Sequence, residues 1–494
     1  MTATLCIDAG TSLIKAVVFD DAGKEVVVAR RPTRVITPGG ARSEQNMADV
    51  WTAVVAASAE AVAAAGVPIG AIAITAQGDG AWFVDSSGAP VGNAILWNDG
   101  RATAILEAWT RSGVVDRAFA INGSASNLGL PNTIMAHLLA ESPRALDPVQ
   151  SVLTCGSWLY LQLTGERVLH VSDASAPWLD IHDGTVSAEA LGLFGLDQHA
   201  SLIPPAVSGS QSKSQLSDAA ARLLGAAPGT PVVLAPYDVV TTAAGSGAVS
   251  VGDAFAILGT TICSGAVVSS PDSSGSTSGL TLRIDSGEAV TRAFPSLAGT
   301  GILDWLSRML GVESVPELAE LAGQSRPGSA GVRVWPYFSP AGERNPFVDT
   351  HARGVIAGLS FDNSQADVAR AALESLAHVV REGLEATGHS PAQLSVSGGG
   401  SASDLWCSII ADVTGVPTVR TTDSQVGAKG ALVHAGVTLG SWSTTAESAA
   451  ALVTVDRIFQ PDPAVAALHD DRHRDFVASR EALAERWREW PRDE

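Results

Sequence analysis

The chain has 494 residues, of which 46% are hydrophobic and 17% charged, and its formal net charge is -20 at pH 7. This length allows two or more domains that each bury a core, and the composition excludes a disordered chain. No run of lysine or arginine interrupts the negative charge, so we expect no binding to nucleic acid, which depends on clustered cations. The expected partners are small molecules, with phosphate held locally by backbone amides and a few bound cations.

The cysteines and the N-terminal sequence predict a cytoplasmic enzyme. The cysteines are Cys6, Cys155, Cys263 and Cys407. They have no CxxC spacing, so we expect buried thiols and neither a zinc site nor a disulfide framework. The first residues lack a basic region followed by a long apolar run, and Glu60 interrupts the alanine-rich segment from Val54 to Ala65. We therefore expect no signal peptide and no membrane span.

The chain opens with a predicted β-hairpin whose tip is polar. Short apolar strands are expected at Thr4 to Ile7 and at Ile14 to Phe19, with Asp8-Ala9-Gly10-Thr11-Ser12 between them. A turn at Asp20 to Gly23 then leads to a third strand at Glu25 to Ala29. Backbone N–H groups and hydroxyls at the tip suit an anion, and Asp8 can hold a metal-bound water. Taken alone, the pattern fits a purely structural turn better.

A second polar loop follows a helix that begins after Asn46, which we predict to be its N-cap. The strand from Ala71 to Thr75 ends in Gln77-Gly78-Asp79-Gly80. Open α/β sheets place ligands directly after buried strands, and the Asp79 carboxylate can accept two hydrogen bonds from a polyol. A turn aspartate between two glycines is the alternative. Trp97, after another apolar run, either stacks on a sugar-like ligand or belongs to the core.

The centre of the chain repeats the pattern of its beginning. Residues 102–224 are mostly helical, with a polar surface loop expected at 208–217 and no catalytic pattern. Asp238 follows an apolar strand at Val232 to Leu234, and Gly259-Thr260-Thr261 connects strands at Phe255 to Leu258 and Ile262 to Val268. The repeated strand-loop-strand order indicates a structural duplication in which each half offers a phosphate-binding turn. A carboxylate near such a turn suggests phosphoryl transfer.

The second half supplies a further glycine-rich turn. An amphipathic helix is expected from Asp367 to Leu384, and a strand at Leu394 to Val396 leads into Gly398-Gly399-Gly400 before the next helix. Glycines between a strand and a helix let the backbone approach a nucleotide closely. No GxxxxGK[ST] sequence occurs, so a P-loop mechanism is excluded. The tract 335–346, with three prolines, is expected to be irregular, and the charged tail from Asp470 to be a solvated helix.

Together these motifs resemble the FGGY carbohydrate kinases of the actin/hexokinase/Hsp70 ATPase superfamily, from about residue 4 to about residue 440. The resemblance implies an α/β fold of two ribonuclease H-like domains related by duplication, with a cleft between them. Residues 1–246 would bind the sugar or polyol. Residues 247–494 would bind the nucleotide, with a helical tail from about residue 443. The family's lysine and tryptophan in the 131–139 region are replaced here by Ile134 and His137.

The resemblance also implies roles for individual residues, with ATP and Mg²⁺ as cofactors. Asp238 would be the general base, and the substrate would be bound by Gln77, Asp79, Trp97 and Asp238. Asp8 would hold the metal through water, with Asp238 as a second candidate ligand. ATP would be bound by Gly10, Thr11, Ser12, Lys15, Gly259, Thr260, Thr261, Gly299, Gly399, Gly400 and Asp404.

The substrate is less tightly specified than the reaction. Glycerol kinases carry arginine and glutamate at the positions of Gly78 and Asp79, and xylulokinases carry methionine and histidine there. The Gln77 to Gly80 segment with Trp82 is most similar to erythritol kinases, whereas Ile95 to Arg101 resembles xylulokinases. We expect phosphorylation of a terminal hydroxyl of a small polyol, erythritol first. A kinase of D- or L-xylulose and a non-catalytic sugar-sensing or conformational ATPase stay open, as does a homodimer.

Overall fold

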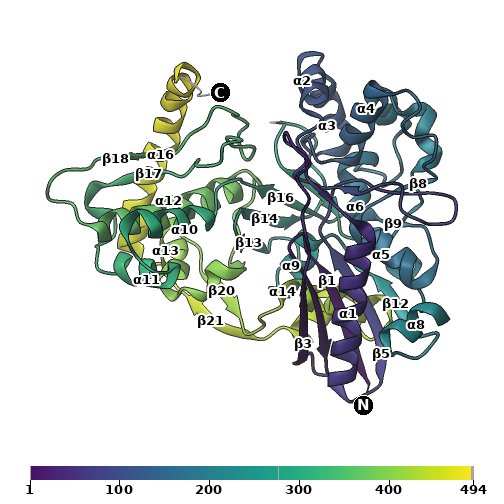
Figure 1. Cartoon of the computed structure of the whole chain (residues 1–494). Helices are drawn as coiled ribbons and strands as arrows, with labels where there is room; N and C mark the ends of the chain where they lie inside the picture. The colour runs from purple at the N-terminus through teal and green to yellow at the C-terminus, as the bar shows by residue number, and fades with distance from the viewer. Residues whose placement is uncertain (1, 276, 491–494) are drawn as a thin grey trace. The chain divides into compact units, whose positions relative to one another are not determined.

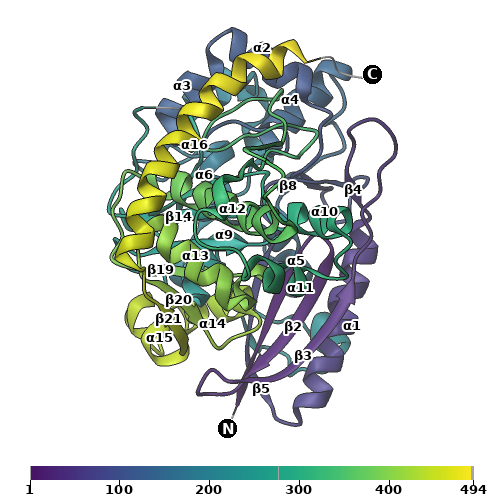
Figure 2. The same cartoon turned by 90° about the vertical axis from the view of Figure 1, so that its left-hand side faces the viewer.

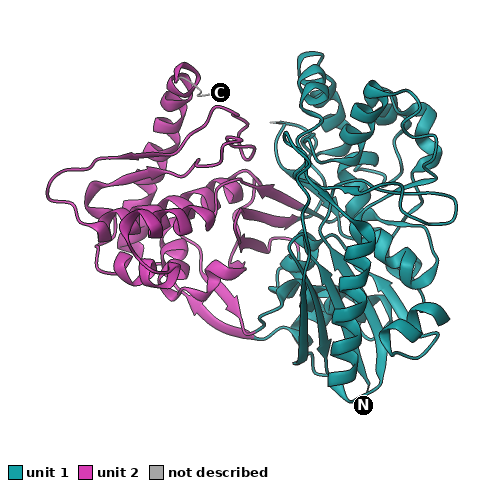
Figure 3. Ribbon diagram, viewed as in Figure 1, with its two compact units in different colours: residues 1–250, 268–291, 423–454 teal, residues 251–267, 292–422, 455–494 magenta. Residues whose placement is uncertain are grey.

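The computed structural model describes residues 2–275 and 277–490, which form two compact units (Figure 3). Unit 1 comprises Met1–Ser250, Val268–Thr291 and Asp423–Thr454, and unit 2 comprises Val251–Val267, Arg292–Thr422 and Val455–Glu494. Both units are discontinuous in sequence, because two later segments pack with the N-terminal one. The division of the chain at residues 246 and 247 stays a prediction.

Unit 1 is built on a mixed sheet in the order β11-β12-β5-β1-β2-β3 (Figure 1). Its strands are β1 (Ala3–Ala9), β2 (Leu13–Phe19), β3 (Glu25–Pro32), β5 (Ile69–Ala76), β11 (Lys213–Gln215) and β12 (Pro231–Leu234). β1 is antiparallel to β2 and parallel to β5, and β5 is parallel to β12. The surface loop expected at 208–217 is therefore wrong in part: β11 is an edge strand whose Lys and Gln are exposed, so its composition is typical of a loop.

Helix α1 (Met47–Ala65) shows how the sequence fixes its ends and its buried face. The Asn46 side chain accepts a hydrogen bond from the Asp49 N–H at 3.1 Å, which confirms the predicted N-cap. Gly66, with φ 64°, ends the helix in the left-handed conformation. Among the described residues α1 is the one helix long and apolar enough to cross a membrane. Its Val50, Val54 and Ala61 lie in the core of unit 1, so it packs as a core helix.

The remaining elements of unit 1 surround this sheet. The helices are α2 (Thr103–Arg111), α3 (Val114–Asn122), α4 (Pro131–Glu141), α5 (Cys155–Thr164), α6 (Val171–Trp178), α7 (Ala188–Phe194), α8 (Asp218–Leu224), α9 (Asp238–Gly245), α14 (Val426–Thr438) and α15 (Thr445–Leu452). The short strands are β4 (Glu44–Gln45), β6 (Trp82–Val84), β7 (Ala94–Ile95), β8 (Ser151–Leu153), β9 (Leu169–His170), β10 (Ala206–Val207) and β15 (Leu280–Arg283). The four cysteines are buried thiols, as predicted.

Unit 2 repeats the topology of unit 1. Its central sheet runs β16-β14-β13-β19-β20-β21. These strands are β13 (Ala254–Leu258), β14 (Ile262–Val268), β16 (Val290–Pro295), β19 (Leu394–Ser397), β20 (Thr418–Thr421) and β21 (Val455–Phe459). β13 is antiparallel to β14 and parallel to β19, β19 is parallel to β20, and β20 is antiparallel to β21. The directions match those of β1, β2, β5, β12 and β11, so the predicted duplication is present in the fold.

Long helices and a short hairpin complete unit 2. They are α10 (Gly301–Leu310), α11 (Val315–Ala322), α12 (Gln365–Glu385), α13 (Asp404–Thr414), α16 (Pro463–Glu489), β17 (Arg333–Trp335) and β18 (Val355–Ala357). A capping box between Ser364 and Asp367 starts α12. After β17 the proline-rich tract has no helix or strand through residue 346, as predicted.

The C-terminal helix α16 is not a simple solvated tail, which corrects the expectation from its charge. It packs against α13 and, through its histidines, against α12 (Figures 1 and 2). Its Phe476 and Trp487 are buried in unit 2. Trp335 donates from Nε1 to the Phe476 carbonyl at 3.0 Å, and Tyr337 meets Trp487 edge-on with centroids 5.7 Å apart. The tail also contains the strand β21 and is not helical throughout.

Three buried histidines join α12 to α16. His378 Nδ1 lies 3.1 Å from His473 Nδ1, and His469 packs against His378 with centroids 5.5 Å apart. A hydrogen bond between two imidazole nitrogens needs one of them to be unprotonated. Burial, and then the neighbouring His473 and His469, hold the pKa of His378 well below 6.5, and burial also lowers the pKa of His469. The helix contact therefore requires a neutral His378.

We predict that unit 2 loses stability as the pH falls through about 6.5. In the unfolded chain His378 binds its proton near the ordinary pKa of 6.5, whereas the folded chain excludes it, so the free energy of unfolding decreases below that pH. Thermal unfolding between about pH 7.5 and about pH 5.5 measures the effect. His378→Leu should flatten the decline, and His182→Gln, at an exposed histidine, should not. An unchanged slope in His378→Leu would contradict this account.

Candidate active site

The tip of the first hairpin places Asp8 and Lys15 side by side. They are register partners on β1 and β2, and Lys15 Nζ lies 3.1 Å from Asp8 Oδ2. Gly10 donates from its N–H to the Leu13 carbonyl at 3.2 Å, which closes the turn. The Asp8 side chain is 13% exposed and so remains reachable from solvent. The hairpin presents a carboxylate, an ammonium and a turn of backbone amides together.

Thr11 at this tip is the centre of a hydrogen-bond network. Its hydroxyl donates to Gln77 Oε1 at 2.6 Å and accepts from Trp97 Nε1 at 2.9 Å. Gln45, which is fully buried, donates from Nε2 to the Thr11 carbonyl at 2.7 Å and accepts from Gln77 Nε2 at 2.8 Å. The amide of Gln77 is thus bonded at both ends. In this geometry Gln77 and Thr11 position the two loops relative to one another within unit 1.

Backbone hydrogen bonds fix both ends of the turn Gln77 to Gly80, which carries Asp79. The Gln77 N–H donates to the Ala9 carbonyl at 2.9 Å, and the Gly80 N–H donates to the Gly129 carbonyl at 2.7 Å. Asp79 is half-buried with φ 52°, an unusual conformation for a residue other than glycine. Backbone strain of this kind persists where surrounding bonds fix it, which is common at binding sites.

Asp238 is the first residue of α9, and two hydroxyls fix the turn before it. The Thr75 hydroxyl on β5 donates to the Pro236 carbonyl at 3.0 Å. The Tyr237 N–H donates to Ser172 Oγ at 2.8 Å. Burial lowers the pKa of His170 to about 3, so its ring is neutral and its Nδ1 accepts from the Ser172 N–H at 3.2 Å. The general-base candidate therefore stands on a rigid turn.

Four carboxylates interact electrostatically at this end of the unit 1 sheet. Burial, followed by the negative charges of Asp8 and Asp173, raises the pKa of Asp238 well above its ordinary value. Burial and the charge of Asp79 raise the pKa of Asp173 to about 7. Sequence reasoning missed Asp173, because Val171 to Trp178 has no polar run after a strand that would mark a site. A better signal was the His170-Val171-Ser172-Asp173 cluster at a helix start.

The residues here fit a magnesium ion. Mg²⁺ prefers oxygen ligands and is typically held through one or two carboxylates together with phosphates. Asp8 and Asp238 supply such oxygens, and the mutual repulsion that raises the pKa of Asp238 is what a divalent cation would relieve. Lys15 already balances one charge at Asp8.

Unit 2 carries the glycine and threonine turns. Thr300 donates from its N–H and its hydroxyl to the Gly259 carbonyl, both at 2.9 Å. A Cβ at Gly299 would lie 2.4 Å from the Thr260 carbonyl oxygen, so only glycine allows the two loops to touch. The N-terminus of α10 follows at once, and its dipole favours an anion. The turn Gly259 to Thr261 therefore lies beside a helix N-terminus, and its binding of phosphate stays a prediction.

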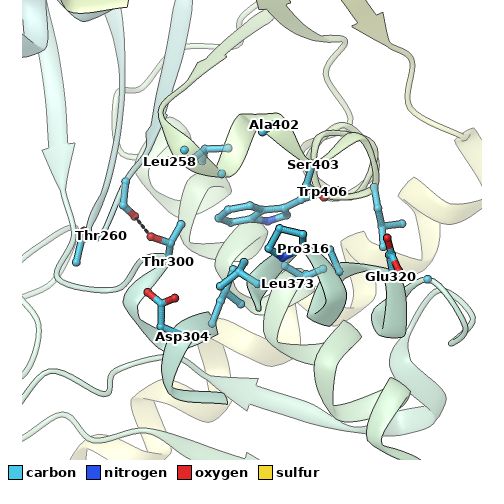
Figure 4. A pocket seen from close by; sticks show the side chains of 18 residues that line it. Leu258, Thr260, Thr300, Asp304, Pro316, Glu320, Leu373, Ala402, Ser403 and Trp406 are labelled. Carbon is cyan, nitrogen blue, oxygen red and sulfur yellow. Dashed lines mark hydrogen bonds between the residues drawn. The ribbon is translucent and has the colours of Figure 1, made fainter. Parts of the chain in front are cut away.

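A cavity of about 770 Å³ in unit 2 opens beside these turns. It is lined by Leu258, Gly259, Thr260, Thr300, Leu303, Asp304, Val315, Pro316, Ala319, Glu320, Gly323, Leu373, Gly399, Gly400, Ala402, Ser403, Leu405 and Trp406. Figure 4 shows the indole ring of Trp406 at its centre, with Pro316 and Leu373 beside it. The combination of an apolar wall and a glycine-threonine rim suits a nucleoside joined to phosphates.

Gly400 is required by Trp406. A Cβ at Gly400 would lie 2.2 Å from Trp406 Cζ3, whereas a Cβ at Gly399 would meet nothing within 4 Å. Asp404, four residues on, lies outside the cavity lining, and its carboxylate is bonded to Arg420 at 2.8 Å and to Arg457 at 2.5 Å. Its role in ATP binding stays a prediction. The contacts observed for its carboxylate are those with the two arginines.

The structure groups the predicted residues in two sets. In unit 1 it joins Thr11, Gln77 and Trp97 by direct hydrogen bonds, pairs Asp8 with Lys15, and couples Asp8, Asp79 and Asp238 by charge. In unit 2 Gly259, Thr260, Gly399 and Gly400 line one cavity. Sequence reasoning did not assign roles to Gln45, Ser172, Tyr237 or Trp406, because buried polar and aromatic residues are ordinary core features until their partners are known.

Comparisons with known proteins agree with this arrangement. The chain matches the FGGY family of carbohydrate kinases, over the N-terminal domain at residues 3–245 and the C-terminal domain at residues 254–439. It is 30% identical to erythritol kinase of Brucella abortus (strain 2308), over 97% of this chain and 96% of that protein. It is 28% identical to xylulose kinase of Escherichia coli (strain K12), over 85% of this chain and 87% of that protein.

Among solved structures, xylulose kinase from Rhodospirillum rubrum superimposes with a TM-score of 0.88 and 26% identity, covering 98% of this chain and 100% of that one. The duplicated sheets, the carboxylate cluster and the glycine-lined cavity define a two-domain α/β phosphotransferase. The chain belongs to the FGGY family of carbohydrate kinases. Kinases of this family use ATP.

We predict that Gly400→Ala weakens ADP binding by about tenfold or more, because the new methyl group must displace Trp406 from the cavity wall. Gly399→Ala is the matched control in the same loop, since its methyl group meets no protein atom, and it should change affinity much less. Isothermal titration of ADP measures both variants. Equal losses in the two would show that the packing of Trp406 is not the cause.

Proposed function

We propose that this kinase transfers the γ-phosphoryl group of ATP to a terminal hydroxyl of a short linear polyol, with erythritol as the first candidate. The observation that carries the proposal is the carboxylate pair of Asp79 and Asp238, which are close enough for the charge of Asp79 to affect the pKa of Asp238. The similarity to an erythritol kinase along nearly the whole chain supports it.

Asp238 is the general base in this proposal. A primary alcohol is a weak nucleophile, and a carboxylate within hydrogen-bond reach can orient it and accept its proton as the oxygen attacks phosphorus. A raised pKa makes Asp238 a better proton acceptor than an ordinary aspartate once it is ionised. Its place at the start of α9, after a turn fixed by Thr75 and Ser172, holds the oxygen in position.

We assign phosphate binding to the glycine turns, and the balancing of the phosphate charge to the first hairpin. Gly259 to Thr261 would bind phosphate through backbone amides, and Lys15 with the tip Gly10 to Ser12 would hold the transferred group. Asp8 would hold magnesium, which would supply positive charge against the phosphates. Asp8 in turn is oriented by Lys15 at 3.1 Å.

Acceptor groups dominate the substrate side, and this favours a polyol over a ketose. Asp79 and Asp238, when ionised, only accept hydrogen bonds, which hydroxyl groups donate. Trp97 Nε1 and Gln77 Nε2 are donors, but the N–H of Trp97 and one of the two N–H groups of Gln77 are bonded to Thr11 and Gln45. A ketone oxygen needs a donor, so a keto sugar gains less from these side chains than a polyol of equal length.

A ketopentose kinase acting on D- or L-xylulose is the second candidate. The similarity to xylulose kinases in sequence and in structure favours it, as does the segment Ile95 to Arg101. In this segment Arg101 donates to Asp99 at 2.8 Å and to Glu44 at 2.6 Å, so it serves the packing of the loop.

The test of substrate class is ADP release with a panel of linear polyols and ketopentoses. We expect kcat/KM to be greatest for a four-carbon polyol and lower by about tenfold or more for D- and L-xylulose. Turnover with xylulose and none with any tetritol or pentitol would replace the first candidate by the second.

Asp238→Asn should reduce kcat by about 10³-fold, because the amide keeps the shape of the side chain and cannot take the proton. Binding of ADP, measured by titration, should stay within about twofold, since the nucleotide cavity is in unit 2. Unchanged ATP consumption in the presence of acceptor would exclude Asp238 as the base.

A further inference from the structure

We infer that the aromatic ring of Tyr237 is a specificity-determining wall of the acceptor site, which uses the space above Gly78 to limit the length of the polyol that reaches Asp238. The inference rests on the proposed function, because it assigns a substrate class to the same site. It adds a residue that neither the motifs nor the carboxylate chemistry required.

The first step is the contact between Tyr237 and Gly78. A Cβ built on Gly78 would lie 1.2 Å from Tyr237 Cε2 and 1.9 Å from Cδ2. The ring therefore occupies the volume in which any side chain at position 78 would begin. Gly78 has no unusual φ, so its backbone does not demand glycine. The ring of Tyr237 is the reason that position 78 requires glycine.

The second step is that the ring cannot swing away. Tyr237 is 9% exposed and belongs to an apolar cluster with Leu130, Val240, Leu280 and Leu282. Its own N–H is bonded to Ser172 at 2.8 Å, so its backbone is also fixed. A buried aromatic side chain packed in this way keeps one rotamer. The wall is thus rigid on the time scale of substrate binding.

The third step is that the two residues in contact each precede one of the functional carboxylates. Asp79 follows Gly78 directly, and Asp238 follows Tyr237 directly. The stacked pair Gly78–Tyr237 therefore joins the loop that would bind hydroxyls to the residue that would take the proton. In this inference an acceptor that reaches both carboxylates lies beside the ring, against which the C–H groups of a linear polyol can pack.

The experiment is a double-mutant cycle read with linear polyols of increasing chain length. The variants are Gly78→Ala, Tyr237→Ala, the double variant and Tyr237→Phe, each checked for folding by thermal unfolding and by ADP binding in unit 2. The readout is kcat/KM for a four-carbon polyol and for five- and six-carbon polyols. A ratio between acceptors is not changed by partial loss of folded enzyme.

We expect Gly78→Ala alone to lower kcat/KM for the four-carbon polyol by about 100-fold, whereas the same change in the Tyr237→Ala background costs about threefold or less. Tyr237→Ala should raise the ratio of five-carbon to four-carbon kcat/KM by about tenfold, and Tyr237→Phe should keep the wild-type ratio within about twofold. Tyr237 is identified as a wall of the acceptor site if its removal both restores the activity of Gly78→Ala and shifts the preferred length of the polyol.

A purely structural role of Tyr237 would lower kcat/KM for every acceptor by the same factor, and this outcome overturns the inference. An additive cycle, with Gly78→Ala equally harmful in both backgrounds, also overturns it. The fate of the proposed function is read separately. If wild-type enzyme prefers xylulose, the polyol proposal fails, while the cycle still decides the role of Tyr237 from the ratio between ketoses of different length.

Discussion

The active end of unit 1 depends on one close backbone contact, between α9 and α14. A Cβ at Gly430 would lie 1.6 Å from the Thr241 carbonyl oxygen, and a Cβ at Gly245 would lie 1.9 Å from the Val426 carbonyl oxygen. Glycine in a helix interior costs about 1 kcal/mol relative to alanine, and α14 contains three glycines. The close packing that these glycines allow offsets the cost, and it places α9 where the charge of Asp8 affects Asp238.

The contact between α9 and α14 explains why Asp8 and Asp238 lie close enough to repel each other. It also explains why the fold tolerates this repulsion. A Cβ at Gly427 would lie 3.2 Å from Asp8 Oδ2, so the same helix also approaches the first hairpin. Helix, hairpin and turn are each fixed by backbone bonds, so Asp238 and Asp8 cannot separate to relieve their repulsion. Under the proposed function, a cation bound at this site would relieve that repulsion.

The sequence was sufficient to predict the structural features that depend on short local patterns of residues. The hairpin strands, the cap at Asn46 and the duplicated topology follow from short apolar runs that end in glycine or aspartate. It was not sufficient for Gln45 and Asp173, whose roles arise from partners 32 residues away at Gln77 and from charges on other elements. The C-terminal helix was misjudged because its charged residues outnumber the few buried positions, such as Phe476, that anchor it.

The two units use one topology for different chemistry. At the ends of β1 and β5 the loops present Asp8 and Asp79, whereas at the ends of β13 and β19 the loops present Gly259 and Gly400. Carboxylates repel phosphate, and glycine turns expose the amides that bind it. Under the proposed function, the duplicated fold assigns hydroxyl recognition and proton removal to unit 1 and nucleotide binding to unit 2 without any change in strand order. What differs between the halves is the residue type at equivalent strand ends, and that difference, more than the sheet itself, determines the reaction.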